Sequence, residues 1–233
     1  MRKSILGALA GLSLAGALPA LDLSLHGGYT SFNMGELNAA NAKLIGYSAK
    51  PYSQPLDSGI VVGADLCGAT PQPWLQWGLR TEFMQSNLAE TKSIYVYYFT
   101  FTDQATLSDL LVGAKASQTL AGGLDLGLGL WAGYGYATLQ QHSARNGIAQ
   151  DGLYMASLPV AEFESSLAYR LGSHLKLSLS GGYRWANVGY LYNGDHAALY
   201  DNAVYWYYSG SWRSPIDVDY SGVTGQGSVS YSF

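Results

Sequence analysis

The 233-residue chain has one cysteine, Cys67, and charged residues make up only 12% of it. A single cysteine cannot form an intramolecular disulfide, so a disulfide-stapled fold is excluded and Cys67 is interpreted as a space-filling residue. No apolar run after residue 20 approaches the roughly 18 residues that a membrane-spanning helix needs, which excludes helical spans. Basic residues number 12 against 16 acidic ones, and this balance argues against nucleic acid as a partner.

Residues 1–20 have the layout of a secretory signal peptide. Arg2 and Lys3 form the charged start, an apolar middle follows, and Ala20 ends a stretch of small residues. The apolar middle is too short to cross a bilayer core of roughly 30 Å, so a membrane anchor is the weaker interpretation. We expect cleavage after Ala20, with residues 15–17 as an alternative site. The chain would then be exported, with residues 21–233 as a single domain of formal charge near −6.

Apolar and polar residues alternate with a period of two in eight segments of the remaining chain. The clearest segment, 123–138, places leucines and tyrosines on one face and glycines, Asp125 and Trp131 on the other. These segments are longer than the roughly five or six residues of a typical strand in a globular protein. Their lengths approach the roughly nine to eleven residues of a tilted membrane strand. The eight predicted strands are 22–32, 59–68, 74–86, 107–118, 123–138, 158–171, 175–187 and 219–233.

The connections between these strands alternate between short and long. Turn-forming residues make up the short connections 68–71, 120–123 and 172–174. A transmembrane up-and-down antiparallel barrel sorts its loops in this way, with short turns in the periplasm and long loops outside the cell. A lipocalin-like soluble barrel is the alternative, with its apolar faces turned inward. The predicted extracellular loops are 33–58, 87–106, 139–157 and 188–218.

The last seven residues alternate strictly and end on an aromatic residue. Val229, Tyr231 and Phe233 share one face, and this ending resembles the signal that the barrel-assembly machinery reads in bacterial outer-membrane proteins. The whole chain after the signal peptide resembles the small eight-stranded outer-membrane barrels of the outer-membrane protein A membrane-domain and outer-membrane protein X type. The resemblance implies a Gram-negative outer membrane, both termini in the periplasm, and lipid and lipopolysaccharide as neighbours.

If the apolar faces contact lipid, the opposite faces line the lumen and carry five acidic and five basic residues. An eight-stranded barrel has an interior just wide enough for side chains to fill. We therefore expect these charges to neutralise one another and plug the lumen, not to line a pore. The glycines beside Trp131 would make room for long basic side chains. The expected lumen residues are Asp65, Arg80, Glu82, Lys115, Asp125, Glu162, Glu164, Arg170, Lys176 and Arg184.

Aromatic residues concentrate in two of the predicted extracellular loops. One interpretation is that they form the outer aromatic girdle that such barrels carry at the membrane interface. The other is a binding surface, because Tyr and Trp offer rigid contact area with a polar tip. A girdle needs rings at one height, whereas the run 205–208 places rings on both faces. The candidate binding residues are Tyr95, Tyr97, Tyr98, Tyr205, Trp206, Tyr207, Tyr208 and Trp212.

The first loop contains the one helix-like segment, 36–44. Leu37, Ala40 and Leu44 share one face at helical spacing. The helix could cover the barrel mouth, pack against the loop aromatics, or enter the lumen. Each placement would tighten closure of the barrel.

The four histidines form no catalytic or metal-binding pattern. His26 is expected to hydrogen-bond in the lumen, His174 lies in a turn and His142 in a long loop. Asp195 and His196 are adjacent, so their side chains point apart on a strand. No cofactor, metal or enzymatic activity is expected.

Together these features predict an integral outer-membrane barrel that presents aromatic-rich loops and has a binding, adhesion or envelope-structural role. Its extracellular ligand is not identified. A small passive channel is the first alternative, and an outer-leaflet lipid or peptide hydrolase built around His142 or His196 is the second.

Overall fold

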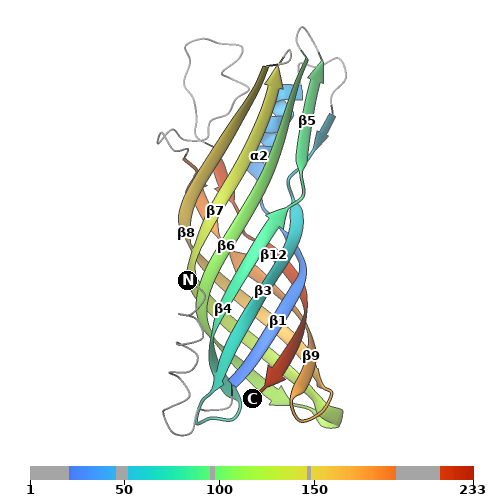
Figure 1. Ribbon diagram of the computed structural model, residues 1–233, viewed down its shortest axis with the longest axis vertical. Helices are drawn as coiled ribbons and strands as arrows, with labels where there is room; N and C mark the ends of the chain where they lie inside the picture. Colours follow the sequence, from blue (N-terminus) through green and yellow to red (C-terminus); the bar gives the residue numbers. More distant parts are fainter. Residues whose placement is uncertain (1–20, 46–51, 95–97, 146–147, 193–215) are drawn as a thin grey trace, which may run out of the picture.

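The computed structural model describes residues 21–45, 52–94, 98–145, 148–192 and 216–233, so the predicted signal peptide lies outside the described residues. Eight antiparallel strands close into a ring, as predicted (Figure 1). No helix among the described residues is long and apolar enough to cross a membrane. Around the ring the strands are β1 (Leu21–Ser31), β3 (Ser58–Ala69), β4 (Leu75–Ser86), β6 (Tyr98–Thr119), β7 (Leu124–Arg145), β8 (Ile148–Arg170), β9 (Leu175–Trp185) and β12 (Gly222–Ser232).

Shorter elements complete the two ends of the ring. At the lower end in Figure 1, a 3₁₀ turn, η2 (Ala121–Gly123), joins β6 to β7, and Gly122 and Gly123 have the positive φ values of 73° and 81° that favour glycine. The outer end carries β2 (Tyr52–Gln54), β5 (Ala89–Ile94), β10 (Asn187–Tyr190), β11 (Asp217–Asp219) and one helix, α2 (Gly35–Ile45).

The ring closes by pairing its first strand with its last. The register runs from Asp22 opposite Ser232 to Thr30 opposite Thr224. The predicted boundaries of β1, β3, β4 and β9 agree with the structure within two residues at each end. Short connections follow β3, β6 and β8, as the turn-forming residues predict.

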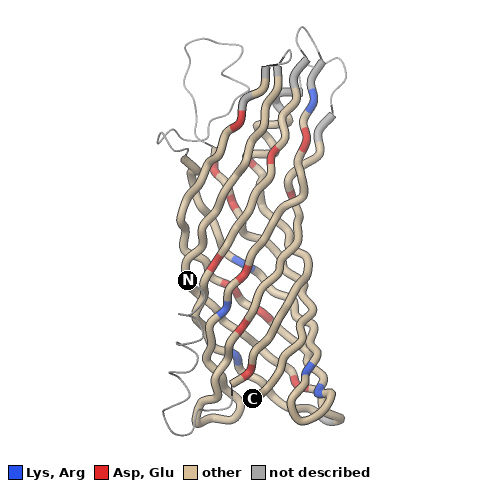
Figure 2. The backbone as a smooth tube through the Cα atoms, viewed as in Figure 1, with Lys and Arg blue, Asp and Glu red and all other residues tan. Residues whose placement is uncertain are grey.

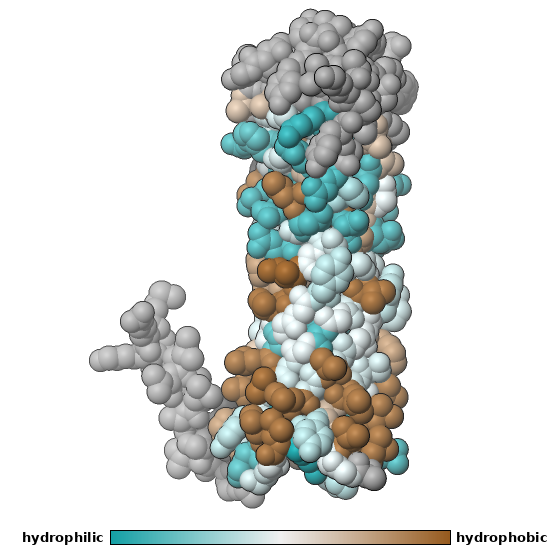
Figure 3. Space-filling view, turned by 90° about the vertical axis from the view of Figure 1, so that its right-hand side faces the viewer, coloured by the Kyte–Doolittle hydropathy of each residue, from teal (hydrophilic) through white to brown (hydrophobic). Residues whose placement is uncertain are grey.

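Large apolar side chains cover the outside of the lower part of the ring (Figure 3). Leu130 on β7 and Leu179 on β9 are 65% and 71% exposed. Such a surface is stable against lipid and unfavourable in water, so the apolar faces point outward and the lipocalin-like alternative is wrong. On β7 the belt runs from Leu124 to Tyr136, a height of about 30 Å at a rise of ~3.3 Å per residue and a tilt of ~40°. This height matches a bilayer core.

Three neighbouring strands continue well beyond the belt, and this corrects two of the predicted loops. β6 begins at Tyr98, β7 continues to Arg145, and β8 begins at Ile148. The predicted loop 139–157 is therefore almost entirely a β7–β8 hairpin, and the predicted loop 87–106 is largely the β5–β6 hairpin. These strands rise about 20 Å above the belt by the same rise and tilt.

The alternation inverts its phase where these strands leave the belt. On β7, Tyr136 is the last large apolar residue that points outward; beyond it Thr138 points outward and Leu139 is fully buried inside. Leu107 on β6 and Leu158 on β8 are buried in the same interior. Above the lipid the outer face contacts water, so apolar residues stabilise the fold only on the inner face. The prediction of a polar interior is therefore wrong for the outer part of the ring, which has an apolar core.

The predicted helix is confirmed as α2, which packs beside β5 and β11 at the upper end of the ring and contributes its buried face to the core. Its other face is exposed at Ala39 and Ala42, so the helix closes the side of the ring at this level and does not fill the lumen. Leu37 and Ala40 are buried. Asn38 fixes the helix to the returning chain, because its Nδ2 donates to the Leu56 carbonyl at 3.0 Å and its Oδ1 accepts from the Leu56 N–H at 2.9 Å.

Candidate functional site

Charged residues lie on several strands of the lower part of the ring (Figure 2). Many of their side chains are buried and therefore point into the lumen. Arg80 on β4 is 2% exposed and is the first centre of this cluster. Its Nε and Nη2 donate to the two oxygens of Asp65 at 2.8 and 3.0 Å. Its Nη1 donates to Glu162 Oε1 at 2.8 Å and its Nη2 to Glu164 Oε2 at 2.8 Å. One guanidinium thus joins β3 and β4 to β8 across the lumen.

Arg184 on β9 is the second centre and is fully buried. It is bonded to Glu82 and Glu162, and its Nε lies 3.9 Å from Asp109 Oδ2. Glu162 therefore connects the two arginines. The pairing of neighbouring strands explains these contacts. Glu162 on β8 lies opposite Arg184 on β9, and Glu82 on β4 lies opposite Asp109 on β6.

His26, Gln226 and the half-buried Lys115 complete the cluster. Glu82 Oε1 contacts His26 Nε2 at 2.9 Å and accepts from Gln226 Nε2 at 2.9 Å. Lys115 Nζ lies 3.4 Å from Glu164 Oε1. His26 is therefore in the lumen, and among the described residues no group of three or more His, Cys, Asp and Glu side chains has the arrangement of a metal site.

Glycines leave the space that these long side chains occupy. Trp131 on β7 points into the lumen, and the Arg80 guanidinium lies 4.3 Å from the centre of its ring. A Cβ added to Gly113 would lie 2.5 Å from the Trp131 ring, and one added to Gly129 would lie 2.7 Å from Glu164 Cγ. Both are closer than real Cβ contacts, so the lumen needs glycine at these two positions.

In the central cluster acidic residues outnumber basic ones, whereas the sequence predicted equal numbers for the whole lumen. Five carboxylates surround two buried arginines and the half-buried Lys115. Sequence reasoning missed Asp109, although it lies on the same face of β6 as Lys115, because the apolar Leu107 and Leu111 interrupt the polar pattern on that face. Asp109 Oδ2 has no hydrogen-bond partner among the described atoms.

The remaining predicted lumen charges form separate pairs at the end of the ring that carries the β6–β7 and β8–β9 turns. Arg170 donates to both oxygens of Asp125 at 2.8 Å and to Thr119 Oγ1 at 2.8 Å. Lys176 lies 3.5 Å from Asp22, an acid that the sequence analysis did not include. The ten predicted residues therefore line one lumen but divide between a buried central cluster and a solvent-exposed rim.

Above the membrane the buried polar contact is Asp103 on β6, which is 1% exposed. Its oxygens accept from Asn41 Nδ2 on α2 at 2.8 Å and from Gln141 Nε2 on β7 at 3.1 Å. Burial raises the pKa of the Asp103 carboxyl, and these two amide donors offset that rise only in part. Asp103 therefore links the helix to the wall through two hydrogen bonds from amide side chains.

A pH dependence of helix docking follows from the raised pKa of Asp103. The folded protein favours the protonated carboxyl, so its contribution to stability is complete below the ordinary Asp pKa and is lost as the pH rises through the raised value. We expect hydrogen-exchange protection of the α2 amides to fall over that range in the wild type and to stay level in Asp103→Asn. Asp151→Asn, which alters an exposed carboxyl at the same height, should keep the wild-type profile.

The structure describes the assembly residues at the C-terminus but not the candidate binding side chains. Tyr95, Tyr97, Tyr205, Trp206, Tyr207, Tyr208 and Trp212 lie outside the described residues, and Tyr98 begins β6 without a described side chain. Val229, Tyr231 and Phe233 point outward at the lower end of the belt and are 49%, 46% and 71% exposed. Their reading by an assembly machinery stays a prediction.

The sequence predicted His142 in a long loop, but the structure places it on β7. It points outward above the belt and its Nδ1 is hydrogen-bonded to Asp151 Oδ1, directly opposite on β8. The neighbouring Ser143 points to the other side of the strand. The Ser143 hydroxyl therefore cannot act as a nucleophile beside the His142–Asp151 pair.

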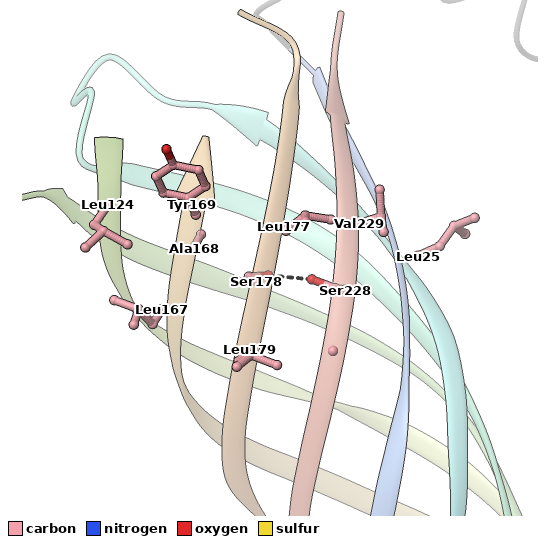
Figure 4. A pocket seen from close by; sticks show the side chains of 11 residues that line it. Leu25, Leu124, Leu167, Ala168, Tyr169, Leu177, Ser178, Leu179, Ser228 and Val229 are labelled. Atoms are coloured by element: carbon pink, nitrogen blue, oxygen red, sulfur yellow. Dashed lines mark hydrogen bonds between the residues drawn. The ribbon is translucent and has the colours of Figure 1, made fainter. Parts of the chain in front are cut away.

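A hollow of about 540 Å³ lies on the belt over β8, β9, β12 and β1 (Figure 4). Its outward-pointing residues include Leu25, Leu167, Leu179 and Val229. The only side-chain hydrogen bond drawn there joins Ser178 to Ser228. The hollow belongs to the lipid-facing surface and offers no charged group to a polar ligand.

No family model and no curated sequence matches the chain. Solved structures similar to it include Neisserial surface protein A, at 9% identity and a TM-score of 0.40 over 92% of this chain and 97% of that one. The outer membrane protease OmpT from Escherichia coli has 8% identity and a TM-score of 0.45 over 92% and 96%. The outer membrane protein OprG from Pseudomonas aeruginosa has 12% identity and a TM-score of 0.43 over 94% and 98%. These values are too low to transfer a function, and the barrel architecture rests on the strand pairing of this chain.

Proposed function

We propose that this chain is an outer-membrane barrel with a closed lumen, which anchors an extracellular β-structure for binding, adhesion or support of the envelope. Lipid and lipopolysaccharide would surround it, and the barrel-assembly machinery would insert it. The apolar belt supports the membrane location, because its height is close to that of a bilayer core. The aromatic loop residues named above are the proposed contact surface for an extracellular ligand.

The observation that carries this proposal is that the interior of the ring is closed at two heights, once within the apolar belt and once above it. In the membrane, Arg80 and Arg184 bridge opposite walls through Glu162, and all three side chains are at most 2% exposed. Above the membrane, the buried face of α2 and the inward leucines close the ring with apolar atoms. A water path would have to break buried charge contacts and a packed core in the same molecule, which is costly.

Single-channel recording in a planar bilayer tests this closure. We expect the refolded wild type, without residues 1–20, to give no stable conductance steps. Arg80→Ala removes the guanidinium that spans the lumen, so it should give detectable openings, and Glu164→Ala should give smaller ones. Arg170→Ala, at the exposed rim, should stay silent like the wild type.

Stable steps in the wild type would contradict the proposal and favour the passive channel, with the lumen charges as its selectivity lining. Heat-modifiable mobility on a gel shows independently that each variant has folded. Glu164→Ala keeps both arginines, so it tests the closure even if Arg80→Ala does not fold.

A further inference from the structure

A polar hollow of about 320 Å³ lies on the outer wall of the ring above the belt. Two rows of outward-pointing residues form it across the ladder of β6, β7 and β8. In the lower row Gln104 lies opposite Gln140, which lies opposite Leu153; in the upper row Thr102 lies opposite His142, which lies opposite Asp151. Leu88, just before β5, closes one side.

The height of this hollow places it beyond ordinary phospholipid headgroups. His142 follows Tyr136, the last aromatic residue of the belt on β7, by six positions. Six residues at ~3.3 Å and a tilt of ~40° rise about 15 Å. Phospholipid headgroups add only about 5 to 8 Å on each side of the hydrocarbon core. The hollow also opens sideways, because its residues share the outward face of the strands.

The lining has the chemistry of a site for uncharged hydroxyl groups. The two glutamine amides and the Thr102 hydroxyl each offer both a donor and an acceptor. His142 and Asp151 are already paired with each other, and the described lining contains no Lys or Arg that would recognise phosphate. Leu88 and Leu153 add apolar contact for the C–H face of a ring.

We infer that this hollow binds uncharged sugar units of glycolipids in the leaflet that surrounds the barrel. The inference rests on the proposed membrane location. A sideways opening at this height faces the headgroups of neighbouring lipids, whereas a site for a free ligand would be reached from above. Its volume lies at the lower end of the range for small-molecule sites, which suits one or two sugar rings.

Lipid retention measured by native mass spectrometry tests the site. The mature protein is reconstituted with a neutral glycolipid that bears an oligosaccharide headgroup, and separately with the same lipid lacking the sugar. We expect the wild type to retain the sugar-bearing lipid about tenfold more strongly, and the double variant Gln104→Ala with Gln140→Ala to lose this preference, because each amide contributes on the order of one hydrogen bond. The free oligosaccharide should bind more weakly than the glycolipid, since membrane anchoring raises its effective concentration.

Gln118→Ala is the matched control. Gln118 is also exposed and points outward, but it lies on β6 near the β6–β7 turn. It should keep the full preference. Equal retention of both lipids by the wild type, an unchanged preference in the double variant, or equally tight binding of the free oligosaccharide would each overturn the inference. Insertion into vesicles and silence in the bilayer recording remain separate readouts, so loss of the sugar preference alone leaves the closed-barrel proposal standing.

Discussion

Arg80→Met should lower the free energy of unfolding by about 3–5 kcal/mol. The substitution removes the guanidinium that contacts Asp65, Glu162 and Glu164, each of which is at most 6% exposed. Glu162 keeps its contact with Arg184 and Glu164 keeps Lys115, whereas among the described residues Asp65 keeps only His26, whose Nδ1 lies 3.7 Å away. An unpaired buried charge is costly because neither water nor a partner stabilises it. Urea titration of the refolded protein in vesicles measures the loss. Adding Asp65→Asn to Arg80→Met should recover part of it by removing one unpaired carboxylate.

Arg170→Met provides the matched comparison. Arg170 holds Asp125 through the same two-bond geometry, but its side chain is 45% exposed at the rim. Screening by solvent limits such pairs to at most about 1 kcal/mol. If both arginine variants lost the same stability, the central cluster would not have the buried character that the closed lumen requires.

Leu130→Arg should destabilise the inserted protein by about 2–4 kcal/mol, because it places a charge on the lipid face near the middle of the belt. Leu130 is 65% exposed in the structure, so the same change on a protein in water would have almost no effect. The expected loss therefore measures contact with lipid and not packing. Reversible unfolding from vesicles gives the value.

Gln140→Arg carries the same new charge on the same strand and the same outward face. It lies four residues beyond Tyr136, above the belt, where an added charge should cost at most about 1 kcal/mol. Comparable losses at positions 130 and 140 would show that the belt does not end near Tyr136.

The membrane-spanning part of the ring could be predicted from sequence because lipid imposes a strict alternation there. The predicted strands 107–118, 123–138 and 158–171 stop or start where the phase of that alternation inverts on β6, β7 and β8. Past those points the apolar residues, such as Leu139, move to the inner face. A sequence pattern that requires apolar residues on the outward face stops at those points. The strands themselves continue, with unbroken backbone pairing.

The lumen was predictable in composition but not in pairing. The face of each strand follows from its period, so Arg80, Glu162 and Arg184 could be assigned to the interior. The link from Arg80 to Glu162 runs between strands that are not neighbours, and only the curvature of the closed ring brings these side chains together. Asp103 was missed for a different reason, since its partner Asn41 comes from a helix whose position the sequence left open.

The uninterrupted β7–β8 ladder also has a mechanical consequence. From Leu124 opposite Tyr169 to Arg145 opposite Ile148, every residue of β7 has a partner, so no hinge separates the part in lipid from the part in water. Tilting the upper sheet relative to the bilayer would have to bend this ladder against its hydrogen bonds. The barrel therefore behaves as one rigid body. Residues on its outer wall above the lipid are held at a fixed height and a fixed angle to the membrane plane.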